Sequence, residues 1–173
     1  MITNIVLATD GSSSARKALN TAIEIAAKHD ARLTVVHVLT HDHPSAELRR
    51  MLEVEHLEEP KPVQTDKSGG TSSAVGRLLK AGMDSAETRA ITVLGEQILN
   101  AASKTAHKAG VKDVDTIIRE GDYANNILEV ADSTGADMIV VGRRGLSKLK
   151  GFVTGSVSHK VSQRANCSVL TVK

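Results

Sequence analysis

The feature that most constrains the fold of this chain is its alternation between short apolar runs and segments with helical periodicity. NIVLAT is an apolar run that ends at Asp10 and Gly11, a pattern typical of a buried strand followed by a turn. Small and aliphatic residues then recur at the spacing of one helical face between residues 15 and 26. The next run, RLTVVHVL at residues 32–39, is rich in β-branched residues and predicts a second strand.

The same alternation returns in the second half of the chain. Apolar residues at helical spacing between 91 and 105 predict a helix that Gly110 ends, and Asp122 is placed to cap another helix that stops at Gly135. VDTIIRE, DMIVVG and CSVLTVK predict three more strands, and Gly155 opens a short helix before the last of them. Strands that alternate with helices indicate parallel pairing through right-handed crossovers. The expected fold is therefore α/β, an open, Rossmann-like, five-stranded parallel sheet with helices on both faces.

The composition fits one domain of this type. The chain has 173 residues, of which 40% are hydrophobic, so a single aliphatic core is large enough to fold. A net charge of +2 and an aromatic content of 1% argue against nucleic-acid binding. Cys167 is the single cysteine, and the chain shows neither a signal-like start nor a long apolar run, so we expect a cytoplasmic protein without membrane insertion.

Residues 40–86 interrupt the alternation. They contain Pro44, Pro60, Pro62 and the turn-rich stretch DKSGGTSS. We expect an insertion here, between the second strand and the second helix of a single domain that spans residues 1–173. Two interpretations stay open, a functional element such as a lid and a disordered surface loop.

The stretch VVGRRGLSKLKGFVTGSVSHKV places glycines and basic residues between the fourth strand and the short helix. A helix start exposes unpaired backbone N–H groups with a partial positive charge, and glycine lets the backbone approach an anion. The pattern favours a phosphate-bearing ligand, with a glycine turn made for packing as the alternative. It is neither a P-loop nor a dinucleotide fingerprint, because no G-K-[ST] follows the glycines and no G-x-G-x-x-G follows the first strand.

Asp10 ends the first strand, and it would face the glycine stretch if the first and fourth strands were neighbours. Its carboxylate can accept a hydrogen bond from a ribose hydroxyl, or it can shape the turn and cap the first helix. His37, His41 and His43 cluster near the end of the second strand, with Asp42 beside them. No cysteine and no second spaced cluster supports a metal site there, so none is predicted. No nucleophile–base pair stands out either, and no catalytic residue is predicted.

These segments together resemble the universal stress protein family in its adenine-nucleotide-binding form. NIVLATDGS resembles the opening strand and turn of the family, TVVHVL its second strand, and GDYANNILEVADSTGADMIVVGRRG its third helix and fourth strand. The spaced motif G-x2-G-x9-G-[ST] is met by Gly142, Gly145, Gly155 and Ser156. The resemblance covers nearly all of the chain outside the insertion.

The resemblance implies the strand order 3-2-1-4-5, a homodimer through the last strand, and ATP as the ligand, with a divalent cation such as Mg²⁺ as an optional companion. It implies that Asp10 contacts the adenosine, that Val38 meets the adenine through its backbone, and that Arg144 lies beside the ribose and phosphates. The nucleotide-binding residues that it implies are Ala8, Thr9, Asp10, Val38, Val141, Gly142, Arg144, Gly145, Gly155, Ser156 and Val157.

The function that follows from the resemblance is an ATP-binding, regulatory stress-response module with little or no turnover. Two alternatives stay open. One is a non-catalytic interaction protein that acts on a protein partner through the 40–86 insertion. The other is a slow ATPase or autophosphorylating protein in which Ser156 accepts the phosphate.

Overall fold

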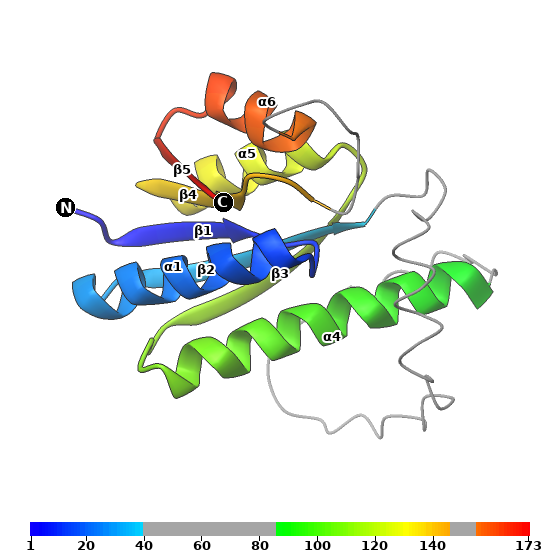
Figure 1. Ribbon diagram of the computed structural model, residues 1–173, viewed down its shortest axis with the longest axis horizontal. Coiled ribbons are helices and arrows are strands. Elements are labelled where there is room, and N and C mark those ends of the chain that lie inside the picture. Colours follow the sequence, from blue (N-terminus) through cyan, green and yellow to red (C-terminus); the bar gives the residue numbers. More distant parts are fainter. Residues whose placement is uncertain (40–85, 146–154) are drawn as a thin grey trace.

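A computed structural model describes residues 1–39, 86–145 and 155–173, which form a parallel sheet flanked by helices (Figure 1). The strands are β1 (Asn4–Ala8), β2 (Arg32–Leu39), β3 (Val114–Glu120), β4 (Met138–Gly142) and β5 (Ser168–Val172). The helices are α1 (Ser13–His29), α4 (Ala86–Lys108), α5 (Tyr123–Thr134) and α6 (Ser156–Arg164). The expected strands and helices are thus confirmed, whereas the insertion that we predicted at residues 40–86 lies almost entirely outside the described residues.

The five strands run parallel in the order β3-β2-β1-β4-β5, which confirms the predicted order. β1 lies at the centre, where Ala8 is opposite Val36 of β2 on one side and Val141 of β4 on the other. The chain builds the sheet outward from β1 to β3 and then returns to add β4 on the other side of β1. The strand order therefore reverses between β1 and β4, the place where open α/β sheets form a binding crevice at the carboxyl ends of their strands.

Helices cover both faces of the sheet, with α1 and α4 on one face and α5 and α6 on the other (Figure 1). Along β2, Leu33 and Val35 belong to the core under α1 and α4, whereas Val36 and Val38 belong to the core under α5. Burial on both faces explains why this strand reads as a continuous apolar run rather than an alternating one. Among the described helices, none is long and apolar enough to cross a bilayer.

Polar side chains cap the starts of α1 and α5, and a glycine ends α5. Ser12 caps α1 by accepting a hydrogen bond from the Ala15 amide at 3.2 Å. Asp122 caps α5 as predicted, because its Oδ1 accepts a hydrogen bond from the Asn125 amide at 2.9 Å. Gly135 ends α5 in the left-handed region at φ 61°, where a residue without a Cβ is favoured.

Candidate functional site

Asp10 and Gly145 lie against each other across the carboxyl ends of β1 and β4. A Cβ atom added at Gly145 would lie 2.5 Å from Asp10 Oδ2, so a side chain at this position would collide with the carboxylate. Asp10 Oδ1 accepts a hydrogen bond from the Ser12 amide at 3.0 Å. The carboxylate therefore shapes the turn into α1 and at the same time faces the glycine loop after β4.

Gly142 brings the end of β4 close to the first turn of α1. A Cβ atom at this position would lie 2.9 Å from the carbonyl carbon of Ser14 and 3.0 Å from the amide nitrogen of Ala15. Both neighbours are backbone atoms, which cannot move aside as a flexible side chain could. In this structure, Gly142 thus allows the end of β4 to pack closely against α1.

Gly155 and Ser158 fasten the start of α6 to the loop after β4. The Gly155 amide donates a hydrogen bond to the Arg143 carbonyl at 2.8 Å, and a Cβ atom at Gly155 would lie 3.1 Å from that same oxygen. Ser158 is 3% exposed, and its hydroxyl lies 3.0 Å from the Arg143 carbonyl oxygen and 3.0 Å from the Gly155 carbonyl oxygen. Ser158 was not identified from the sequence. The signal that could have found it is a serine at a core-facing position of a short helix that is mostly polar.

The first turn of α6 offers backbone donors for an anion. The helix has no side-chain cap, and its first backbone hydrogen bond runs from the His159 amide to the Gly155 carbonyl at 3.0 Å. Ser156 and Val157 precede that bond, so their amides belong to the donors that a helix start presents without an intrahelical acceptor. The Gly155 amide already donates to the Arg143 carbonyl, so it is not one of these donors. Gly155 contributes to such a site because it has no side chain there.

Thr9 and His37 join the ends of β1 and β2. The Thr9 amide donates to the Val36 carbonyl at 3.0 Å, and the Thr9 carbonyl oxygen lies 2.7 Å from His37 Nδ1. Because a carbonyl only accepts, Nδ1 carries the proton. Burial lowers the pKa of His37 below its ordinary 6.5, against smaller opposing effects of the Thr9 carbonyl and the charge of Asp10, so the ring is neutral at pH 7.

The backbone groups of Val38 also point toward the end of β1. The bonds from the Arg32 amide to the Thr3 carbonyl and from the Thr9 amide to the Val36 carbonyl show that even-numbered residues of β2 direct their backbone groups toward β1. Because this direction alternates along a parallel strand, the Val38 amide and carbonyl face the crevice at the level of Thr9. Its side chain is buried under α5 at 6% exposure.

The fold brings the predicted nucleotide-binding residues to one edge of the sheet. Ala8 is paired with Val141 where β1 and β4 end, and the Val141 side chain is buried at 3% exposure. Arg144 is exposed in the loop beside Gly145. His41, Asp42 and His43, considered above as neighbours of His37, lie outside the described residues.

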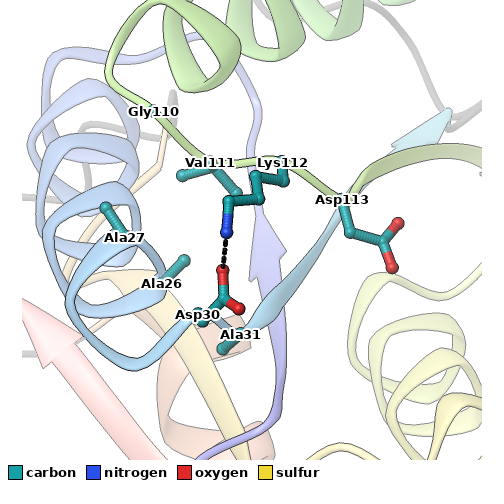
Figure 2. Close-up of a pocket in the computed structure, with 8 residues that line it drawn as sticks. All are labelled: Ala26, Ala27, Asp30, Ala31, Gly110, Val111, Lys112 and Asp113. Atoms are coloured by element: carbon teal, nitrogen blue, oxygen red, sulfur yellow. Dashed lines mark ion pairs between the residues drawn. The ribbon is translucent and has the colours of Figure 1, made fainter.

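A hollow lies at the opposite ends of the strands, between the end of α1 and the segment that joins α4 to β3 (Figure 2). Its volume is about 290 Å³, and alanines of α1 and Val111 form its apolar walls. Lys112 reaches across it to Asp30, with 3.0 Å between Nζ and Oδ1. None of the predicted site residues lines it, and it lies at the amino ends of β2 and β3, away from the crevice.

The comparisons with known proteins point to a single family. The sequence profile of the universal stress protein family matches residues 1–173. The chain is 34% identical over 174 residues to the universal stress protein YxiE of Bacillus subtilis strain 168, and the match covers 100% of both chains. It is also 34% identical over 171 residues to the stress response protein NhaX of the same strain, covering 98% of this chain and 96% of that protein.

Solved structures agree with this fold. A universal stress protein crystallised in complex with cAMP is 28% identical, with a TM-score of 0.63 and coverage of 99% of this chain and 97% of that chain. The universal stress protein UspA from Lactobacillus plantarum is 20% identical, with a TM-score of 0.69 and coverage of 99% and 98%. The chain described here belongs to the universal stress protein family.

Proposed function

We propose that this protein binds an adenine nucleotide, in particular ATP, in the crevice at the carboxyl ends of β1, β2 and β4. The observation that carries the proposal is the apposition of Asp10 and Gly145, with 2.5 Å between the carboxylate and the place of a Cβ atom. It joins an acceptor at the end of β1 to a glycine loop that leads into an uncapped helix start. A related protein, 28% identical to this chain, was crystallised with cAMP.

Each part of an adenine nucleotide has a suitable group in the crevice. The Asp10 carboxylate accepts hydrogen bonds from the adenosine part, and the Val38 backbone offers one donor and one acceptor to the edge of the adenine. The Ser156 and Val157 amides bind phosphate oxygens at the positive end of α6, and Arg144 adds a positive charge beside them. Gly145 keeps the space beside Asp10 clear.

A divalent cation would enter this site with the nucleotide. Among the described residues, no group of three or more His, Cys, Asp or Glu side chains is arranged to hold a metal ion. Mg²⁺ commonly keeps several waters and takes phosphate oxygens as ligands, so the phosphates would supply much of its coordination shell.

The proposed role is regulatory, in a stress response and with little or no turnover. Binding would shift the conformation or the choice of partner, and the lone Cys167 suits the reducing cytoplasm. Phosphate release after incubation with ATP tests this role. Slow phosphate release would support the ATPase alternative. An added phosphate in the intact mass that Ser156→Ala abolishes would support the autophosphorylating alternative.

A homodimer through β5 is part of the proposal. β5 is the last strand in the sheet order and pairs with β4 on one side. Val169, Leu170 and Val172 are only partly buried in the single chain, so pairing with a second copy would remove apolar surface from water. Sedimentation of the purified protein should show a dimer that Leu170→Lys weakens, and a monomer at high concentration would contradict it.

Calorimetric titration of the nucleotide-free protein with ATP, ADP, AMP and cAMP tests the proposed function. We expect saturable binding of ATP at one site per chain. Gly155→Val should weaken it strongly, because its side chain would press on the Arg143 carbonyl and displace the start of α6. Absence of binding for all four nucleotides at millimolar concentration would refute the proposal.

A further inference from the structure

His37 is a buried histidine to which the proposed nucleotide contacts assign no role. It lies one residue before Val38 in β2, and 8% of its surface is exposed. Its ring faces α4, because a Cβ atom at Gly95 of that helix would lie 2.9 Å from His37 Cδ2 and 3.4 Å from Nε2. Gly95 thus leaves space for the ring between α4 and the end of β1.

The ring has a single proton arrangement in this position. Nδ1–H donates to the Thr9 carbonyl at 2.7 Å, which leaves Nε2 without a proton in the neutral ring. From the turn after β1, Asp10 is the charged group that acts on the ring. The neighbours from α4 and β3 are Gly95 and the register partner Ile118, which carry no charge.

We propose that His37 is a positioning residue for the nucleotide site, which holds the Thr9–Asp10 turn in place by donating its Nδ1–H to the Thr9 carbonyl. The part of this inference that concerns nucleotide affinity rests on the proposed function. The part that concerns the turn does not, because the turn exists in the protein without a nucleotide.

His37 supports this turn from a distant part of the sequence, as does the bond from the Thr9 amide to the Val36 carbonyl of β2. Two further hydrogen bonds of the turn are local. Gly11 donates to Thr9 Oγ1 at 3.3 Å and Ser12 donates to Asp10 Oδ1 at 3.0 Å, each across two residues. The ring of His37, by contrast, reaches the turn from a residue 28 positions away. Losing that donor would leave the Thr9 carbonyl poorly satisfied and let Asp10 move relative to Gly145.

Two neutral substitutions distinguish the role of Nδ1 from that of Nε2. In His37→Asn, the side-chain amide nitrogen can take the place of Nδ1, whereas in His37→Gln it reaches the place of Nε2 instead. We would measure ATP affinity by calorimetry and the exchange rates of the Gly11 and Ser12 amides for both variants. The expected result is an affinity within about threefold of the unmodified protein for His37→Asn, and a loss of about tenfold for His37→Gln, the size of one hydrogen bond. The two amides should exchange faster in His37→Gln than in His37→Asn.

A measurement on the unmodified protein keeps the inference testable even if a variant does not fold. In ¹⁵N-labelled protein at pH 7, the long-range histidine spectrum should show His37 with its proton on Nδ1. A proton on Nε2, or equal affinity and exchange in the two variants, would overturn the inference. If the unmodified protein binds no nucleotide, the proposed function fails, and the proton position and the amide exchange still decide whether His37 holds the turn.

Discussion

At the residue scale, the site depends on short contacts between residues that are far apart in the sequence. Gly145 has no room for a side chain, because Asp10 Oδ2 lies 2.5 Å from the place of its Cβ atom. Ser158 is buried at 3% exposure, with its hydroxyl directed at the Arg143 and Gly155 carbonyls. Each contact joins the end of a strand to a loop or helix start, which are the places where a ligand would meet backbone.

Gly145→Ala should weaken ATP binding by roughly tenfold or more, because an added methyl group either displaces Asp10 or pushes the loop outward. Calorimetry measures the affinity. Gly135→Ala is the matched control, since Gly135 lies at the end of α5 with φ 61° and no atom within 4 Å of an added Cβ. It should lower stability by about 1 kcal/mol through backbone strain and leave the affinity unchanged. Equal affinities for Gly145→Ala and the unmodified protein would show that the Asp10 contact does not shape the site.

Ser158→Ala should lower the free energy of unfolding by about 1 kcal/mol, because the Arg143 and Gly155 carbonyls lose the hydrogen bond that the buried Ser158 hydroxyl shares between them. Urea denaturation gives the value. Ser162→Ala is the control on the same helix: its hydroxyl donates to the Ser158 carbonyl at 2.8 Å on a more exposed face, so a change within about 0.5 kcal/mol is expected. Similar losses in both variants would mean that Ser158 acts only as a helix residue and does not fasten the loop.

At the scale of elements, a carboxylate fixes how β1 and β4 begin. Asp137 precedes β4, and its Oδ2 accepts hydrogen bonds from the Thr3 amide at 2.7 Å, the Thr3 hydroxyl at 2.8 Å and the Asn4 amide at 3.0 Å. The Asp137 amide in turn donates to the Asn4 carbonyl at 2.9 Å. These bonds set the register in which Ala8 comes to lie opposite Val141, and so they help to align the two strand ends that form the crevice.

Asp137 should make the stability of the protein sensitive to strong acid. The hydrogen bonds from Thr3 and Asn4 lower the pKa of the Asp137 carboxyl below its ordinary 3.8. Its stabilising effect is therefore fully present above pH 3.8 and is lost as the pH falls through the lowered value in the folded state. Urea midpoints measured across this range should fall less steeply for Asp137→Ala than for the unmodified protein, and parallel curves would contradict the assignment.

The elements were predictable from the sequence, because their signals are local. Burial on both faces makes β2 a continuous apolar run, and Asp122 and Gly135 mark the ends of α5 by their capping chemistry. The contacts of Asp10 with Gly145 and of His37 with Thr9 could not be derived in the same way. They depend on which strands are neighbours and on how much space lies between them, which a periodic pattern does not encode. The strand order itself was implied by the family resemblance and not by periodicity.

At the scale of the whole molecule, the fold buries His37 beside the crevice and thereby keeps its ring neutral. Burial lowers the pKa of His37 below 6.5, with Asp10 as the charged neighbour that opposes this shift. Well above pH 6.5 the ring is neutral in both the folded and the unfolded chain. As the pH falls below 6.5, the unfolded chain binds a proton before the folded one does, so stability decreases until the lowered pKa of the folded state is passed.

Stability measured between pH 7.5 and about 5 should therefore decline with acidification in the unmodified protein, and this part of the decline should be absent in His37→Asn. Thermal unfolding at a series of pH values provides the comparison. An unchanged decline in His37→Asn would assign the acid sensitivity to other groups.

The central claim is that the crevice at the carboxyl ends of β1, β2 and β4 is the nucleotide site. Mapping of backbone amide chemical shifts during titration with ATP tests it most directly. We predict that the largest changes cluster at Asp10, Val38, Gly145 and Ser156, with little change at Asp30 and Lys112 beside the opposite hollow. Changes centred on that hollow, or no saturable change in any amide, would contradict the claim.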